Sequence, residues 1–338
     1  MNLPARITLD HGSGGLVSQE LISGLFLKYL RCPQLRHLED CALLEGISGQ
    51  IAFSTDSYVV DPLFFPGGDI GKLAVHGTIN DLAMRGARPI ALSLALIMEE
   101  GFELTKLERI IASVAESSEA AGVAVVTGDT KVVPRGKADG IFITTTGIGR
   151  VANRVFISGT KARPGDVVLL SGTLADHGIT IMTAQAGLEV GGDLHSDTQP
   201  LHRMVAALLD DVEDAVHVLR DPTRGGLATT LCEIARSSAV EIEVDEEHLP
   251  IRPAVATACA LIGLDPLYLA NEGKCIVICS PEAQYKVLAV MRALPEAADA
   301  VCIGRVIDGR AGRVNLRTRI GGQRLLEPLT GQPLPRIC

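Results

Sequence analysis

The chain has 338 residues, of which 47% are hydrophobic and 21% are charged, and its formal net charge is -9. This length predicts two domains with a large buried interior. The hydrophobic content excludes a disordered chain, and the acidic balance excludes the basic face of a typical nucleic-acid-binding protein.

The N-terminal residues, the longest hydrophobic stretch and the spacing of the cysteines together predict a protein of a reducing compartment. The first ten residues lack the basic and apolar regions of a signal peptide. The most hydrophobic stretch, 89–98, is about half the length of a membrane span. The eight cysteines form no Cys-x-x-Cys pair, so we expect most of them to be core residues of a cytoplasmic protein without membrane contact. Cys338, the last residue of GQPLPRIC, is the exception.

The first half of the chain is predicted to alternate strands and helices. Apolar residues recur at helical spacing over 16–30. Gly86 followed by Pro89 is typical of a helix end, and Thr105 with Glu108 forms a capping-box pattern at a helix start. We expect helices at 16–30, 73–86 and 105–121, and strands at 5–10, 41–46, 51–57, 89–98, 122–133 and 140–149.

The second half repeats this mixture of elements. We expect strands at 163–172, 271–280 and 301–307, a turn and a helix within 174–187, a loop from 221 that leads into a helix from 227 to 238, and helices from Pro253 onward and at 281–295. Residues 313–329 are typical of a hairpin that turns on Gly321 and Gly322. The sequence therefore predicts an α+β fold with two domains, 1–155 and 156–326, followed by a tail over 327–338.

Several aspartates stand at the edges of apolar elements, where a strand or helix can direct a carboxylate into a cleft. Converging carboxylates repel each other unless a hard cation neutralises them, and Mg²⁺ prefers oxygen ligands and leaves positions open for phosphate. The alternative is that each aspartate is an ordinary turn or capping residue. The five aspartates are Asp40, Asp56, Asp81, Asp129 and Asp221.

A glycine-rich loop, HGSGG, precedes the first predicted helix and contains Gly12, Gly14 and Gly15. Backbone N–H groups at a helix start attract anions such as phosphate. The chain contains neither a P-loop nor a dinucleotide-binding glycine pattern. A loop of small residues without a ligand explains HGSGG equally well.

Longer motifs carry a family resemblance that covers essentially the whole chain. It resembles the superfamily that contains aminoimidazole ribonucleotide synthetase and selenophosphate synthetase, through the motifs STDSYVV, TINDLAMRGARPIALS, VTGDTKVV, SGTLADHG, DPTRGGLATTL and LANEGK in this order. The final PRIC is similar to the signature of one branch, the HypE family of hydrogenase maturation factors.

This resemblance implies a fold and an activity. It implies a homodimer whose N-terminal domains, here 1–155, pair into a β-barrel and bind ATP with Mg²⁺ beside it. The C-terminal thiol would receive a carbamoyl group from the carbamoyltransferase HypF. ATP would drive its dehydration to a thiocyanate, and the cyano group would pass to iron on the HypC–HypD complex for NiFe hydrogenase.

The resemblance also implies roles for individual residues. Dehydration requires a base near the thiocarboxamide on Cys338, and Glu272 and Lys131 are the candidates. The alternatives are a salt bridge for Glu272 and a phosphate clamp for Lys131. Mg²⁺ would be held by Asp40, Asp56, Asp81 and Asp221, and the nucleotide by Gly12, Gly14, Gly15, Asn80, Asp129 and Thr130.

The tail from Glu327 to Cys338 spans at most about 40 Å when extended. Its prolines favour an extended chain, so we expect a mobile tether that visits partners outside and the ATP cleft inside. Two other functions stay open. A selenophosphate-synthetase-like enzyme would act on a free small molecule, although HGSGG lacks the reactive cysteine of that family. A non-catalytic scaffold would only dock maturation partners.

Overall fold

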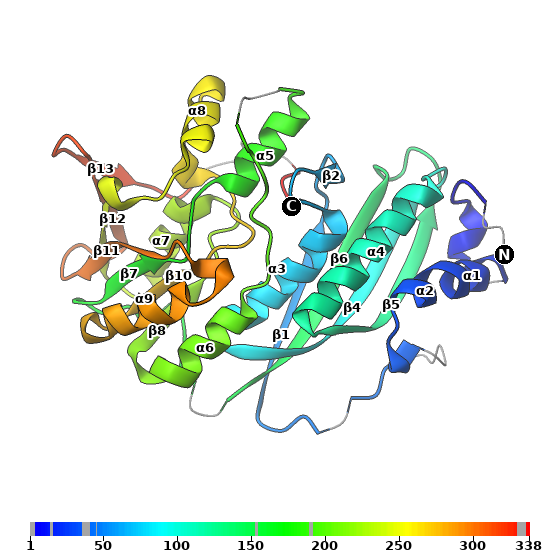
Figure 1. The fold of residues 1–338 in the computed structure, drawn as a ribbon, viewed down its shortest axis with the longest axis horizontal. Helices are drawn as coiled ribbons and strands as arrows, with labels where there is room; N and C mark the ends of the chain where they lie inside the picture. Colours follow the sequence, from blue (N-terminus) through cyan, green and yellow to red (C-terminus); the bar gives the residue numbers. More distant parts are fainter. Residues whose placement is uncertain are drawn as a thin grey trace.

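The computed structural model describes residues 4–13, 16–35, 41–44, 46–152, 155–188, 192–329 and 336–338. Figure 1 shows two α+β parts side by side, each built on its own sheet, with the C-terminus between them beside β2. The predicted α+β architecture of two parts is therefore confirmed. None of the helices within these ranges is both long and apolar enough to span a bilayer.

The first part contains a four-stranded sheet in the order β1-β6-β4-β5. Only β4 and β5 run parallel, and the other neighbours are antiparallel. The strands are β1 (Gln50–Tyr58), β4 (Ala87–Glu99), β5 (Ala124–Val133) and β6 (Ile141–Val151).

Two helices, α3 (Ile70–Met84) and α4 (Leu104–Ala121), cover one face of this sheet (Figure 1). Leu73 and Ile79 of α3 and Leu107 of α4 are fully buried in the core between the helices and the sheet. Each such side chain contributes about 1.5–3 kcal/mol by leaving water. Asp69 begins α3 by accepting hydrogen bonds from the Gly71 and Lys72 N–H groups. The core therefore fixes α3 against β1, where the candidate site lies.

No α-helix of the described chain covers the opposite face of the four-stranded sheet, although Leu35, Ala42 and Leu44 pack against Ala91 and Ile148 at one end of it. Along β1, residues 51, 53, 55 and 57 are exposed while the intervening ones are partly covered. Ile51 is 55% and Phe53 is 71% exposed, and Ile97 of β4 is also exposed. Because alternate strand residues point to opposite faces, the part of this face around Ile51, Phe53 and Ile97 is an apolar surface that no other described segment covers.

The second part contains a seven-stranded sheet in the order β13-β12-β9-β11-β7-β10-β8. Its strands are β7 (Val167–Leu170), β8 (Val216–Arg220), β9 (Glu241–Asp245), β10 (Ile276–Cys279), β11 (Val301–Ile307), β12 (Arg313–Arg317) and β13 (Gln323–Leu326). Its helices are α5 (Asp176–Gln185), α6 (His202–Val212), α7 (Gly226–Ser237), α8 (Pro253–Ile262) and α9 (Gln284–Arg292). Separate apolar clusters on its two faces bury all of β10.

Short elements complete the chain. At the N-terminal end, α1 (Leu16–Leu21), a π-helical turn (Ile22–Phe26) and α2 (Leu27–Tyr29) form one helical segment. β2 (Phe64–Phe65) pairs with β3 (Gly68–Asp69). The 3-10 turns are Leu9–Gly12, Pro33–Leu35, Glu213–Ala215, Glu246–His248, Pro266–Tyr268, Pro281–Ala283 and Pro295–Ala297.

The remaining predicted helices and strands and the hairpin between β12 and β13 are confirmed, but three local predictions are wrong. Residues 5–10 form no strand, because the Thr8 N–H bonds to His11 Nδ1 and a 3-10 turn follows. The described residues of 41–46 form no strand, and Leu43 there is 81% exposed. Helix α4 begins at Leu104, so Thr105 does not cap it. No element was expected at α6, β8 or β9.

Candidate active site

A cavity of about 750 Å³ lies between the two parts, a size typical of small-molecule sites. One wall comes from the end of β1 and from α3, and the other from the loop after β8 and the segment before β10. Side chains of both charge signs line it. They include Asp56, Tyr58, Asp81, Arg85, Arg220, Asp221, Arg224, Glu272 and Cys338.

Three aspartates converge on this cavity. Ser54 Oγ donates to Asp81 Oδ2 at 2.6 Å. Burial raises the pKa of Asp56 to about 6, and the neighbouring Asp81 carboxylate adds to this rise. Burial likewise raises the pKa of Asp221 to about 7, again with a contribution from Asp81. Negative charge here is therefore under-compensated by the protein, as expected of a site that receives a cation.

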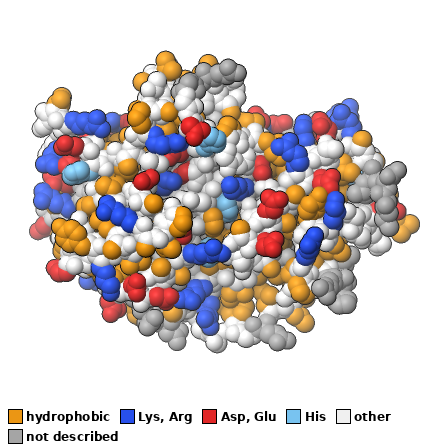
Figure 2. Space-filling model, viewed as in Figure 1, with side chains coloured by type: hydrophobic (Ala, Val, Ile, Leu, Met, Phe, Trp, Pro, Cys, Tyr) orange, Lys and Arg blue, Asp and Glu red, His pale blue; other side chains and the backbone are white. Residues whose placement is uncertain are grey.

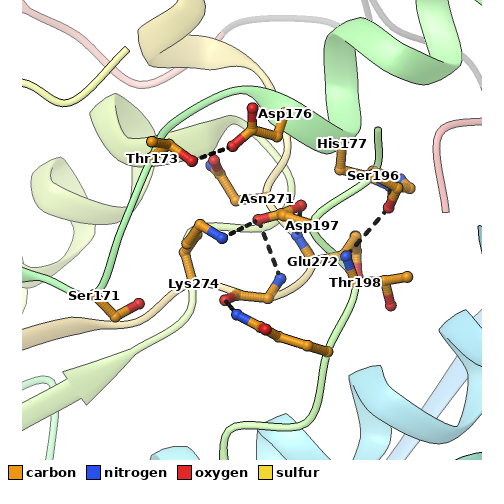
Figure 3. A network of polar contacts seen from close by, with 12 residues as sticks. Ser171, Thr173, Asp176, His177, Ser196, Asp197, Thr198, Asn271, Glu272 and Lys274 are labelled. Carbon is orange, nitrogen blue, oxygen red and sulfur yellow. Dashed lines mark hydrogen bonds and ion pairs between the residues drawn. The ribbon is translucent and has the colours of Figure 1, made fainter. Parts of the chain in front are cut away.

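Glu272 is buried at the same cavity, and its Oε1 has no hydrogen-bond partner. Burial raises the pKa of its carboxyl well above the usual range, and the Asp197 carboxylate raises it further. Asp197 fixes the backbone here: it accepts from the N–H groups of Glu272 at 3.1 Å and Gly273 at 3.3 Å (Figure 3). Lys274 Nζ lies 3.4 Å from Asp197 Oδ2 and balances its charge.

Cys338 reaches this cavity as well. Burial raises the pKa of its thiol to about 12, Glu272 and Asp56 raise it, and Arg224 opposes them. The sulfur is therefore a neutral thiol at pH 7 in this position. The structure thus brings together Asp56, Asp81, Asp221, Glu272 and Cys338, which are distant in sequence.

A second group of predicted residues lies elsewhere. Gly12, Asp129, Thr130 and Lys131 line a separate cavity of about 210 Å³ beside β5. A side chain at Gly12 would overlap the backbone of residue 132, so glycine permits this approach. β1 and β5 are opposite edges of the sheet, three strand spacings or roughly 14 Å apart. Within this chain, Lys131 therefore lies apart from Glu272 and Cys338.

Both parts of the chain match the models of one known protein family. The N-terminal domain of the AIR synthase related proteins matches residues 38–151, and their C-terminal domain matches 163–317. A carbamoyl dehydratase HypE of Azotobacter vinelandii is 51% identical, covering 98% of this chain and 97% of the relative. The chain belongs to the HypE family of carbamoyl dehydratases.

Solved HypE structures agree in fold. A crystal structure of the hydrogenase maturation protein HypE in complex with ATP has a TM-score of 0.95 and 52% identity, covering 98% of this chain and 99% of its own. The HypE chain of a HypE–HypF complex has a TM-score of 0.81 and 44% identity, covering 91% and 99%.

Three predicted residues of this HypE-family chain, Asp40, Gly14 and Gly15, lie outside the described residues. Asn80 lies on α3 with its amide bonded to the other part of the molecule. Its Nδ2 donates to the carbonyls of Gln199 at 3.0 Å and Glu272 at 3.3 Å, and its Oδ1 accepts from the Leu201 N–H. Asn80 thus joins α3 to the segment that carries Glu272.

Sequence reasoning missed Tyr58, Arg85 and Asp197. The first two line the cavity and stand inside the family motifs STDSYVV and TINDLAMRGARPIALS, which was the available signal. Asp197 stands in no such motif. Its role depends on a contact with Glu272, 75 residues away, so no local pattern indicates it.

The carboxylates of this HypE-family site fit Mg²⁺ by their chemistry. Asp56, Asp81 and Asp221 offer the oxygen donors that a hard cation prefers, in a cavity that raises two of their pKa values. Among the described residues, no three His, Cys, Asp or Glu side chains are close enough to hold a metal ion alone. Further ligands would therefore come from water, a nucleotide phosphate or Asp40.

Proposed function

We propose that this chain dehydrates a carbamoyl group on Cys338 to a thiocyanate at the expense of ATP. One observation carries the proposal: the terminal cysteine shares a cavity with Glu272 and the three aspartates. Membership of a family whose relatives are carbamoyl dehydratases supports it. A relative that binds ATP, with 52% identity, supports the choice of nucleotide.

The reaction must remove an oxygen that is a poor leaving group. The thiocarboxamide carbonyl oxygen bonds to the γ-phosphorus of ATP while the bond from that phosphorus to ADP breaks. The carbon–oxygen bond then breaks, phosphate leaves, and the nitrogen loses two protons to give S–C≡N. Phosphoryl transfer of this kind depends mainly on positioning and on charge neutralisation.

Glu272 is the base that we assign to the amide protons. Its carboxylate oxygen Oε1 is unpartnered and its backbone is held by Asp197, so it is oriented and available. A carboxyl with a raised pKa is a stronger base once ionised than an ordinary one. Arg85, Arg220 and Arg224 line the same cavity and would neutralise phosphate oxygens.

Mg²⁺ would be held by Asp56, Asp81 and Asp221, with Asp40, and would neutralise phosphate charge. The three described aspartates come from β1, α3 and the loop after β8. Because these aspartates stand on separate elements, they would hold the nucleotide phosphates against both parts of the molecule. Glu272 would then act on the amide of the group that Cys338 carries.

Homodimer formation is part of the proposal. The uncovered sheet face with Ile51, Phe53 and Ile97 is the surface that we assign to a β-barrel with a second copy. A two-fold arrangement that joins β1 of one protomer to β5 of the other brings the two groups of predicted residues together. Gly12, Asp129, Thr130 and Lys131 would then contact the nucleotide bound mainly by the other protomer.

The tail connects this site with other proteins. HypF, which is bound to HypE in a solved complex of a relative, is the carbamoyl donor that we propose. An iron-carrying HypC–HypD complex would accept the cyano group for NiFe hydrogenase. The tail over 327–338 would leave the cavity for both transfers and return for dehydration.

Intact-mass measurement tests this function. The protein is incubated with a HypF carbamoyltransferase system and then with ATP and Mg²⁺. We expect a gain of one carbamoyl unit followed by loss of one water, both located on the peptide ending in Cys338, and neither in Cys338→Ala. ATP turnover that is unchanged in Cys338→Ala would instead support a free small-molecule substrate.

A further inference from the structure

The last three residues, Arg336 to Cys338, occupy a groove that the described contacts define well. The Val59 N–H donates to a Cys338 main-chain oxygen at 2.9 Å, and the Asp61 N–H donates to the Arg336 carbonyl at 3.2 Å. The two donors and the two acceptors are each two residues apart and occur in opposite order. The tail therefore runs antiparallel to the segment that follows β1, as an added strand would.

The Arg336 side chain fixes the register of this pairing. Its Nε donates to the Val59 carbonyl at 2.8 Å, and its guanidinium forms an ion pair with Asp139. Gln185 Nε2 donates to the carbonyls of Asp61 at 2.8 Å and Arg336 at 3.3 Å. Arg336 has a φ of +52°, which is unusual for a residue with a side chain. These bonds hold it in that conformation.

His177 completes the groove from α5. Its Nε2 lies 2.8 Å from the Ile337 carbonyl, which can only accept, so Nε2 carries the proton. Its Nδ1 then accepts from Ser196 Oγ at 2.7 Å, and Ser196 Oγ accepts from the Thr198 N–H. Figure 3 shows His177 and Ser196 side by side. Burial lowers the pKa of His177, consistent with this neutral tautomer.

The groove and the base Glu272 belong to one connected unit. The Ala175 N–H, just before α5, donates to Asn271 Oδ1 at 2.8 Å, and the Gly178 N–H donates to the Ala270 carbonyl at 2.9 Å. Arg252 pairs with Asp176 at 2.6 Å and fixes the start of α5. His177 is therefore held at a constant position relative to Glu272.

We propose that this terminal groove, with His177 as its positioning residue, sets the depth at which the Cys338 sulfur enters the cavity. The contacts above use the backbone of the tail and the Arg336 side chain, and none uses the sulfur. The groove therefore holds the thiol, the thiocarboxamide and the thiocyanate forms equally. This inference rests on the proposed function, because it assigns the groove to that reaction.

The first experiment measures water loss in a single turnover of the full-length carbamoylated protein. We expect His177→Ala to slow water loss about tenfold by removing one hydrogen bond to the tail. His177→Gln, whose amide N–H can donate to the Ile337 carbonyl, should retain most of the rate. Carbamoylation by HypF should be unchanged in both, and exposed His248→Ala is the matched control. Equal rates in His177→Ala and wild type would overturn the proposal.

The second experiment does not depend on a buried substitution. Hydrogen exchange of the Val59 and Asp61 amides reports tail docking directly, and Arg336→Ala changes only the tail. We expect equal protection in the three sulfur forms of the wild type, and about tenfold faster exchange in Arg336→Ala. The proposed role of the groove would be wrong if carbamoylation changed the exchange rate of these amides tenfold, or if Arg336→Ala left that rate unchanged. If the wild type did not lose water, the proposed function would be wrong. The exchange rates would still show whether the tail docks in the groove.

Discussion

The cavity between the two parts and the smaller cavity beside β5 differ in how their charges are balanced. In the first, burial raises the pKa of Asp56, Asp221 and Glu272, and carboxylates outnumber nearby partners. In the second, Asp129 is exposed and pairs with Lys131 at 3.0 Å, which lowers the pKa of its carboxyl. Negative charge in the first cavity is therefore under-compensated, whereas the Asp129 carboxylate of the second is balanced by Lys131 of the same chain.

The face of the molecule drawn in Figure 2 carries surface charges of both signs. Figure 2 shows Lys and Arg side chains interspersed with Asp and Glu on this face, without a large area of one sign. Inside the cavity between the two parts, by contrast, Asp and Glu side chains outnumber Arg side chains. Buried, uncompensated charge rather than surface charge therefore distinguishes the site.

The largest expected effect belongs to Glu272 in the first cavity. Glu272→Gln preserves size but removes the base, and loss of general base catalysis lowers rates by about 10²–10⁴. Single-turnover water loss from the carbamoylated protein measures this, with ATP binding as the control. In the wild type the rate should rise with pH up to the raised pKa of Glu272, because only the ionised form accepts protons. An unchanged rate in Glu272→Gln would remove Glu272 from the mechanism.

Stability should reveal the charge imbalance of the first cavity. Burial raises the pKa of Asp221 in the folded state to about 7, above the value of about 4 that is usual for an aspartate in an unfolded chain, so the folded state binds its proton more tightly. The free energy of unfolding of the metal-free protein should therefore fall by a few kcal/mol, roughly, as pH rises from about 4 to 7. Asp221→Asn should flatten this decline, and Mg²⁺ with ATP should reduce it. Urea titrations at several pH values measure it.

A smaller effect, on ATP binding, is expected from Lys131 in the second cavity. Lys131→Ala should weaken ATP binding about tenfold through loss of a charged contact to phosphate, without loss of thermal stability because Lys131 is exposed. Reassociated mixtures of Lys131→Ala and Glu272→Gln then test whether one site uses both protomers. Half of the dimers are mixed and hold one intact site, so at ATP concentrations well below saturation, where Lys131→Ala sites are mostly empty, about a quarter of wild-type activity should return. If no activity returned, the two cavities would not form one active site across the dimer.

The smallest effect concerns the uncovered sheet face. Phe53→Asp places a charge where a second copy would pack, and should shift the protein toward monomers in sedimentation experiments. The fold should stay intact, since Phe53 is 71% exposed in one protomer. Surface Tyr285→Asp, at an exposed position on α9, is the matched control. A Phe53→Asp dimer of unchanged stability would place the interface elsewhere.

The sequence predicted the elements with clear periodicity and the residues within motifs. Strands β1, β4, β5 and β6 and helices α3, α4 and α7 agree because apolar spacing reflects the core that they bury. The resemblance assigned Asp56, Asp81, Asp221, Glu272 and Cys338 to one site, and the structure places them around one cavity.

Long-range contacts account for what the sequence did not predict. His177 and Ile337 are 160 positions apart, so no local pattern predicts that one binds the other. The separation of Lys131 from Glu272 depends on strand order rather than on either motif. Residues 5–10 resemble a strand by composition, yet a His11 side chain turns the backbone. The intrinsic propensity of a short segment for helix or strand therefore does not determine its conformation where side-chain hydrogen bonds or strand pairing favour another one.

The high pKa of the docked Cys338 thiol has a consequence for its chemical survival. Oxidants and alkylating agents attack the thiolate, and a sulfur whose pKa is raised to about 12 is almost entirely protonated at neutral pH. While it rests inside the cavity, the Cys338 sulfur is therefore shielded from oxidative damage. Under the proposed function, its exposure to such damage would be confined to the intervals in which the chain end leaves the cavity.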